Sequence, residues 1–408
     1  MNNTKYRRLI CWLIYCAPLA IYFVKFYHQE IGADLLMRLT EAKYFRIQIN
    51  PYDVFHGVKP AIGAYGNQLA AYSFFSYIFA GLLNKVSNSS QVAILIFICI
   101  DFVALIGGVV LTNKIRSRTM DQYFGYKIEI EHNENNIRIN LLFMLVLMCS
   151  PYFWQHIYFL NYTVLSIFGL LLLIYSLMRG WTPLALCGMF LIGLRPSLAI
   201  PVFIYLFFAK RWKILVLSIL SYLGILILAS WWLHENPIRM IRQLIEIQGH
   251  FSNNLGYYHA DGFLLALKSI LGSYTTLASV IISCLVVAYY RNYLSNPIIS
   301  LFLIIAVSTS LFYTQVHAWI GIFPMLLIAI TNISRSDRTS MIIVSLLIIF
   351  LIAPRLTGYV NEEFRYQYTV IHNMLRFGAL WFATVLAINK MKFASIKSLS
   401  LNASHNAH

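Results

Sequence analysis

Charge is scarce in this 408-residue chain: only 15 residues are acidic, and charged residues of both signs make up 11% of the sequence. A soluble globular protein carries about 25% charged residues, because its surface must be solvated. Hydrophobic residues make up 59% of the chain. The shortage of charge excludes a cytosolic enzyme, a secreted protein and a classical DNA-binding domain, and it indicates that a lipid bilayer surrounds most of the chain.

The motifs of several enzyme classes are also missing. The sequence contains no CxxC pair, no DxD pair, no GxxxxGKS/T loop, no HExxH and no GxSxG. These absences argue against redox carriers, the soluble nucleotide-sugar fold, ATPases, zinc proteases and serine hydrolases of the nucleophile-elbow type. No cofactor and no metal ion is therefore expected, although the sequence leaves metal dependence open.

The scarce charge is strongly unbalanced, with 31 basic residues and a net charge of +16. In a soluble protein this excess would indicate nucleic acid as a partner. In a chain this apolar we expect no nucleic acid. The excess instead favours a membrane protein that follows the positive-inside rule and handles an anionic lipid.

Apolar stretches of near-spanning length recur along the whole sequence. A helical span needs about 20 mostly apolar residues, and fewer where helices are buried in a bundle. The candidate spans are 9–26, 67–83, 91–112, 139–155, 162–178, 181–194, 197–209, 214–232, 274–290, 297–316, 318–332, 340–353 and 373–391. They predict an all-α, polytopic membrane helix bundle of about 12 spans, forming a single integral membrane domain over 1–408.

Basic clusters set the predicted orientation. We expect Lys5–Arg8, Lys210–Lys213, Arg335–Arg338 and Lys390–Lys397 to lie on the cytoplasmic side. One early segment must then fail to cross, and 67–83, with its polar and small residues, is the predicted one. The polar loop 113–138 falls in the cytoplasm, and three hydrophilic loops share the outer face: 27–66, 233–273 and 354–372.

The first outer loop carries the clearest local pattern. Residues 32–55 predict a helix with one apolar stripe near the membrane interface, broken at Asn50-Pro51 because proline restrains its predecessor from helix. Asp34 stands at the start of this helix, and Glu41 lies two turns later on the same side. Asp34 could serve as a helix N-cap or as a chemical group, and the pattern alone leaves both open.

A span, an Asp-bearing interfacial helix and an Asn-Pro-Tyr-Asp turn together resemble the start of the C superfamily of membrane glycosyltransferases (GT-C). The nearest resemblance is to its polyprenyl-phosphate-mannose-dependent mannosyltransferases. In that superfamily an acidic residue just after the first span is the catalytic base, and it corresponds here to Asp34. A carboxylate suits that role, because it must deprotonate the acceptor hydroxyl while the anomeric carbon is attacked.

Three later stretches extend the resemblance. The family's Gly-Gln-x-Asn turn is matched at Asn161 but not at its Gly-Gln. Its Lys-Pro within an apolar stretch is replaced by Arg195-Pro196, which keeps a cation able to bind phosphate. Its late Trp/His cluster corresponds to His317-Ala318-Trp319. The resemblance implies that Arg195 and His317 bind the donor phosphate, whereas Arg195 could also snorkel or pair with Asp101.

The outer loops also contain residue types common in sugar binding. Residues 238–247 predict an amphipathic interfacial helix. The expected sugar- or acceptor-binding residues are Glu41, Asp53, Asn161, Tyr258, His259 and Asp261. Each of these could instead be an ordinary loop residue packing on the bundle.

Three functions fit these patterns. The resemblance favours transfer of a mannose-like hexose from a polyprenyl-phosphate sugar to an envelope glycan or glycolipid, at the periplasmic face of a bacterial inner membrane. An O-antigen-type polymerase or ligase is the alternative, since Arg46 and Gly57 match an Arg-x10-Gly spacing. A lipid-linked-sugar flippase is the third, and it predicts charges inside spans and repeat symmetry between halves, neither of which is evident.

Overall fold

The computed structural model describes residues 17, 20, 21 and 24, and then 32–60, 74–87, 89–124, 134–254, 274–312, 320–333, 338–352 and 362–405. Every regular element in this part of the chain is helical, as predicted for the fold class. The predicted first span, 9–26, lies almost wholly outside the described residues.

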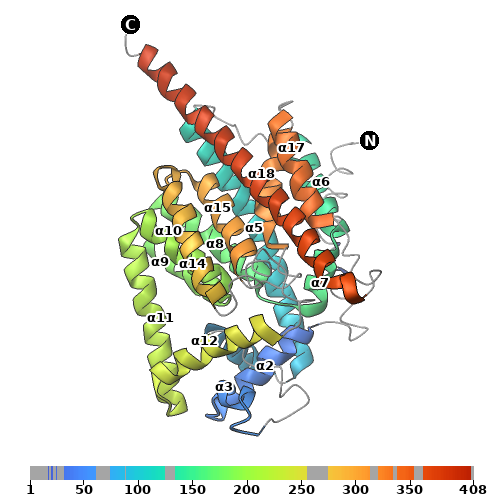
Figure 1. Ribbon diagram of the computed structural model, residues 1–408, viewed down its shortest axis with the longest axis vertical. Helices are drawn as coiled ribbons and strands as arrows, with labels where there is room; N and C mark the ends of the chain where they lie inside the picture. The colour runs from blue at the N-terminus through green and yellow to red at the C-terminus, as the bar shows by residue number, and fades with distance from the viewer. Residues whose placement is uncertain are drawn as a thin grey trace, which may run out of the picture.

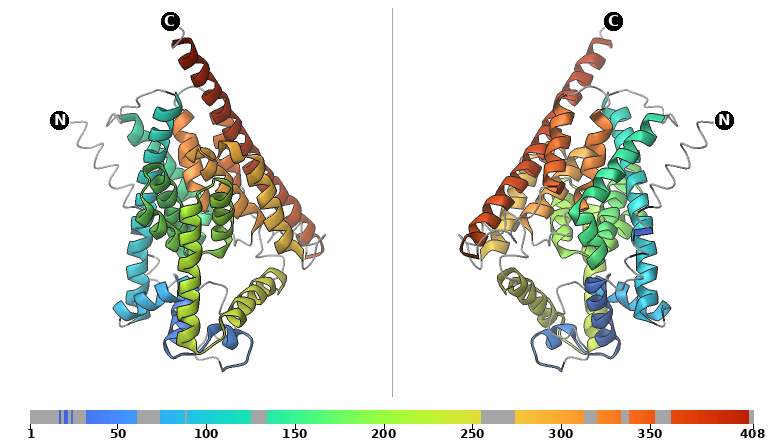
Figure 2. Two further views of the ribbon diagram at one scale, coloured as in Figure 1. Left: turned by 90° about the vertical axis from the view of Figure 1, so that its left-hand side faces the viewer. Right: turned by 90° about the vertical axis from the view of Figure 1, so that its right-hand side faces the viewer.

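Three helices are long and apolar enough to cross a membrane. They lie within α5 (Ser90–Phe124), α11 (Trp212–Leu233) and α18 (Glu362–His405), with the apolar parts at Ser90–Gln122, Trp212–Leu233 and Ile371–Lys392. A bent pair, α6 (Glu134–Cys149) and α7 (Pro151–Phe159), could form a fourth span. Figure 1 shows both α5 and α18 running through the bundle, and they are in contact over only part of their length, since they diverge toward the bottom of the views in Figure 2.

The other apolar segments form helices shorter than a full span. They are α4 (Phe74–Val86), α8 (Thr163–Arg179), α9 (Thr182–Gly193), α10 (Pro196–Phe208), α14 (Thr275–Tyr289), α15 (Pro297–Leu311), α16 (Phe323–Ile333) and α17 (Arg338–Ile352). At 1.5 Å per residue they reach only about 17–26 Å, against about 30 Å of hydrocarbon. Length alone therefore supports fewer full spans than the 12 predicted.

Two predicted boundaries are wrong. Residues 113–124 do not belong to a loop, because α5 continues as one helix of 35 residues to Phe124. The predicted span 139–155 is not a single helix, because it bends by 65° between α6 and α7 at Ser150-Pro151. Proline cannot donate the backbone hydrogen bond that would continue the helix.

The predicted outer loop 354–372 is also partly helical, since α18 begins at Glu362. The other two predicted outer loops carry helices too: α2 (Ala33–Arg46) and α3 (Pro51–Phe55) in the first, and α12 (Pro237–Asn254) in the second. Both the helix after Gly32 and the break at Asn50-Pro51 were predicted from the sequence, and Asn50 caps α3 by accepting from the Tyr52 N–H at 3.0 Å.

The helices α2, α3 and α12 lie together across one end of the bundle, at the bottom of Figure 1 and in both views of Figure 2. We call this the α12 end. The indole of Trp232, at the end of α11, donates to the Phe45 carbonyl oxygen of α2 at 2.8 Å. Two loops that are nearly two hundred residues apart in the sequence therefore form one layer.

Close packing of α8 against α9 holds the centre of the bundle. Gly169 and Gly188 face each other so closely that a Cβ atom on Gly188 would lie 2.7 Å from the Gly169 carbonyl oxygen. Small residues allow two helix backbones to approach in this way. The start of α8, which carries Thr163, is thereby fixed relative to α9 and to Arg195 just beyond it.

Candidate functional site

The buried face of α2 carries three charged side chains in one row. Asp34, Arg38 and Glu41 are 7%, 2% and 0% exposed. Arg38 donates to the Glu41 carboxylate at 2.6 Å and lies 3.4 Å from the Asp34 carboxylate. One guanidinium thus compensates two acids at i−4 and i+3, the spacings that meet on one helix face. We call these residues the α2 triad.

Asp34 does not cap its helix. The N-cap of α2 is Gly32, which has a φ of 89° and makes no side-chain capping bond. The Gly32 N–H donates instead to the Tyr158 carbonyl oxygen at 2.8 Å, which joins the start of α2 to the end of α7. The predicted position of Asp34 at the helix start and its shared face with Glu41 are confirmed, and the N-cap interpretation is wrong.

Buried tyrosines surround the α2 triad. Tyr162, at the start of α8, lies within electrostatic range of all three triad charges. Tyr52 of α3 is fully buried near Glu41 and Arg38, and burial raises the pKa of its phenol. The triad therefore sits in a low-dielectric setting, where charge–charge interactions are stronger than at a surface.

Arg195 contacts the residue that follows Tyr162 in the sequence. It stands immediately before α10 and donates to the Thr163 hydroxyl at 2.6 Å. The side-chain oxygen of Asn161 accepts from the Thr163 N–H at 2.8 Å, just before α8 begins. The structure thus brings Asn161 and Arg195 together at Thr163, the residue after Tyr162.

The space beside Arg195 is small. Among the described residues it is lined by Thr163, Ser308, Thr309 and Gly321, and its volume is about 10 Å³. That is the room of roughly one water molecule. The predicted partner His317 lies outside the described residues, as do Tyr258, His259 and Asp261.

Pairing with Asp101 was the alternative to phosphate binding for Arg195, but the structure pairs Asp101 with a histidine instead. Its carboxylate oxygen lies 2.8 Å from the His156 Nε2, between α5 and α7, and both side chains are buried. The need of Asp101 for a partner is readable from the sequence, because an acid within an apolar stretch is costly unless paired. The identity of the partner is not, because His156 is 55 residues away.

Asp53 joins α3 to α12. Its carboxylate accepts from Gln243 at 2.8 Å and from Arg239 at 3.1 Å, while Asn50 donates to the Gln243 side-chain oxygen at 3.0 Å. Burial and the charge of Asp53 raise the pKa of nearby Glu235. Asp53 was predicted to bind sugar or acceptor, and in this structure its bonds hold the α12 end together.

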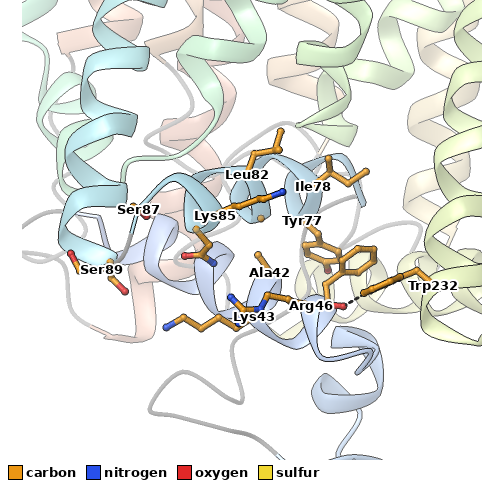
Figure 3. Close-up of a pocket in the computed structure, with 14 residues that line it drawn as sticks. Ala42, Lys43, Arg46, Tyr77, Ile78, Leu82, Lys85, Ser87, Ser89 and Trp232 are labelled. Atoms are coloured by element: carbon orange, nitrogen blue, oxygen red, sulfur yellow. Dashed lines mark hydrogen bonds between the residues drawn. The ribbon is translucent and has the colours of Figure 1, made fainter.

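A larger cavity of about 850 Å³ opens between α2 and α4. We call it the α2–α4 pocket. Figure 3 shows Lys43, Arg46 and Lys85 on it, together with Tyr77 and Trp232. Serines and Asn84 add hydrogen-bonding groups, and Ile78 and Leu82 add apolar surface. Such a combination suits an anionic, hydroxyl-bearing ligand with an apolar part.

Sequence reasoning missed the central residue of the triad, Arg38, and the cations of the α2–α4 pocket. The spacing of Asp34, Arg38 and Glu41 could have revealed the triad, since it places all three on one helix face. The pocket had no such signal, because it also requires Lys85 from α4 and Trp232 from α11.

Metal binding finds no support in the described ranges, where no group of three His, Cys, Asp or Glu side chains could hold a metal ion. No protein-family model, no curated protein and no solved structure matches this chain.

Proposed function

We propose that this protein is a multi-pass membrane glycosyltransferase. It transfers a mannose-like hexose from a polyprenyl-phosphate sugar to an envelope glycan or glycolipid. The observation that supports this most strongly is the α2 triad, which holds a carboxylate beside Tyr162 at the end of the bundle where the interfacial helices gather. Within this proposal the α12 end faces the outside of a bacterial inner membrane.

In the proposed reaction Asp34 accepts the proton of an acceptor hydroxyl. The hydroxyl oxygen forms a bond to the anomeric carbon while the bond from that carbon to the phosphate oxygen breaks, so that polyprenyl phosphate leaves with both electrons. A single base is enough for such an inverting displacement. Arg38 holds Asp34 in place and keeps a positive charge near the developing phosphate charge.

Distance argues against the cations of the α2–α4 pocket as ligands of the donor phosphate. The base must lie in hydrogen-bond reach of the hydroxyl, and the reacting atoms about 3–3.5 Å apart, so the phosphate lies on the order of 6 Å from Asp34. Lys43 lies nine residues along α2, about 13 Å away. The resemblance points instead to Arg195 with His317 as ligands of the donor phosphate, and we assign the α2–α4 pocket to an anionic part of the acceptor.

This assignment requires a local change at Arg195. A phosphate does not fit into about 10 Å³, so the Arg195–Thr163 hydrogen bond must open when the donor binds. Thr163→Val removes the acceptor of that bond and is expected to bind the donor at least as tightly as the wild type does. Arg195→Gln removes the cation and is expected to raise the KM for the donor.

The test is a donor comparison with the purified full-length protein and a membrane-glycan acceptor. Transfer from radiolabelled polyprenyl-phosphate hexose supports the proposal. Incorporation only from pyrophosphate-linked oligosaccharides contradicts it and favours the polymerase alternative, in which Arg46 of the α2–α4 pocket is a phosphate ligand. Movement of the lipid-linked sugar across vesicles without any new glycosidic bond favours the flippase.

A further inference from the structure

A second basic site lies at the end of the bundle away from α12. Ser90, where α5 begins, lines the α2–α4 pocket, so the later turns of α5 are at the opposite end. There a cavity of about 340 Å³ opens between α5, α10 and the start of α15, which we call the Arg118 pocket. Its polar lining residues are Arg118, Gln122, Tyr205, Arg211 and Ser295.

Two cations, Arg118 and Arg211, line this pocket, and further cations lie near Arg118. Tyr175 of α8 is surrounded by Lys114, Arg118 and Arg179, with the charged groups 6.0, 5.5 and 5.9 Å from its ring centre. Arg211 adds a further charge, within electrostatic range of the Tyr205 hydroxyl. The cations come from three separate parts of the chain, so their convergence is a product of the fold.

The acid nearest to these cations along α5 is Asp121, three residues after Arg118. Within the described part of the chain, Lys114, Arg118, Arg179 and Arg211 form no ion pair, although the acids of the α12 end are all bound to Arg or Lys. No acidic residue is among those that line the Arg118 pocket. Like charges held together repel one another, so an anion that entered the cavity would relieve the repulsion.

Tryptophans near the pocket indicate its depth in a bilayer, and this depth indicates which anion could reach it. Trp181 and Trp212, next to Arg179 and Arg211 in the sequence, are about half exposed, and the Arg179 guanidinium lies 5.6 Å from the Trp181 ring. Exposed tryptophans are typical of the interface between hydrocarbon and headgroups. Trp181 and Trp212 therefore favour headgroup depth for the Arg118 pocket.

We propose that the Arg118 pocket binds the phosphate of an anionic phospholipid headgroup. Arg118 and Arg211 supply charged forks from two different parts of the chain, and Gln122, Tyr205 and Ser295 supply hydrogen bonds for the glycerol or other headgroup hydroxyls. The site is independent of the proposed transfer reaction, because it lies at the other end of α5 from the α2–α4 pocket.

Native mass spectrometry of the full-length protein in detergent tests this, with phosphatidylglycerol, phosphatidylcholine and inorganic phosphate as probes. We expect preferential retention of phosphatidylglycerol, and about 30-fold weaker binding of it by the double variant Arg118→Gln/Arg211→Gln. Arg291→Gln, an exposed cation outside the pocket, is the matched control and is expected to bind as the wild type does.

The double variant Arg118→Lys/Arg211→Lys keeps the charge and is expected to retain most of the affinity, which separates loss of charge from loss of folding. Equal binding by the Gln double variant, equal loss in Arg291→Gln, or equal retention of phosphatidylcholine would each overturn the proposal. Binding of inorganic phosphate as tight as that of the lipid would assign the site to a free phosphate instead.

Discussion

Removing the guanidinium of Arg38 is expected to destabilise the protein far more than a surface change would. Arg38 is 2% exposed and compensates both Asp34 and Glu41. Breaking a buried pair by removing one partner costs about 3–5 kcal/mol, because the other charge is left uncompensated. Arg38→Met keeps most of the side-chain volume, so the expected loss of about 3–5 kcal/mol in the free energy of unfolding reports charge rather than packing.

A double-mutant cycle measures how strongly Arg38 and Glu41 depend on each other for stability. Glu41→Gln alone leaves Arg38 with Asp34 and is expected to cost about 1–3 kcal/mol. Adding Glu41→Gln to Arg38→Met removes a stranded carboxylate, so the double variant should be more stable than Arg38→Met by about 1 kcal/mol or more. Reversible unfolding in mixed detergent micelles measures all four proteins. Strictly additive costs would refute the idea that the triad acts as one electrostatic unit.

Three further predictions follow from other parts of the structure. Gly188→Ala should destabilise the protein by about 1–3 kcal/mol, because its Cβ meets the α8 backbone, whereas Gly224→Ala, with nothing within 4 Å, should be neutral or gain up to about 1 kcal/mol; urea unfolding in micelles compares them. Glu235 has a raised pKa in the folded protein, so its contribution to stability is full below the unfolded value near 4.3 and is lost as pH rises through the folded value. Asp53→Asn removes one cause of the raised Glu235 pKa, so the stability of this variant should depend less on pH in that range. A stability–pH profile as steep as that of the wild type would contradict this prediction. A spin label at Ile241, on the exposed apolar face of α12, should collide with oxygen dissolved in the bilayer more often than a label at Arg242. Power-saturation EPR measures this in liposomes, with the native cysteines of the protein replaced. Equal values at the two positions would place α12 away from lipid.

Local patterns predicted the helices of the α12 end well. Asn50-Pro51 ends the first helix region because its chemistry is local: an extended residue before proline and a side chain that caps the next helix. The amphipathic helix expected over 238–247 is α12, whose Ile238 and Ile245 are 75% and 65% exposed on one face. Helical periodicity is likewise a property of neighbouring residues.

Distant pairings and helix ends were harder to predict. Hydropathy falls after residue 112, but α5 continues because residues such as Lys114 and Arg118 are good helix formers whatever their polarity. Asp101 and His156 meet only through the packing of α5 and α7. The cations of the α2–α4 pocket are brought together by two helices and the end of a third. Such convergence depends on tertiary structure, which no local pattern encodes.

The central claim is that Asp34 is the base of a sugar transfer, and the initial rate of hexose transfer by Asp34→Asn tests it most directly. Asparagine keeps the shape of the side chain but cannot accept the proton, so we expect a loss of at least about 100-fold in kcat, with the KM for the donor little changed. Lys213→Gln, at the opposite end of the bundle, should transfer at the wild-type rate. A rate for Asp34→Asn within a few-fold of wild type would contradict the account.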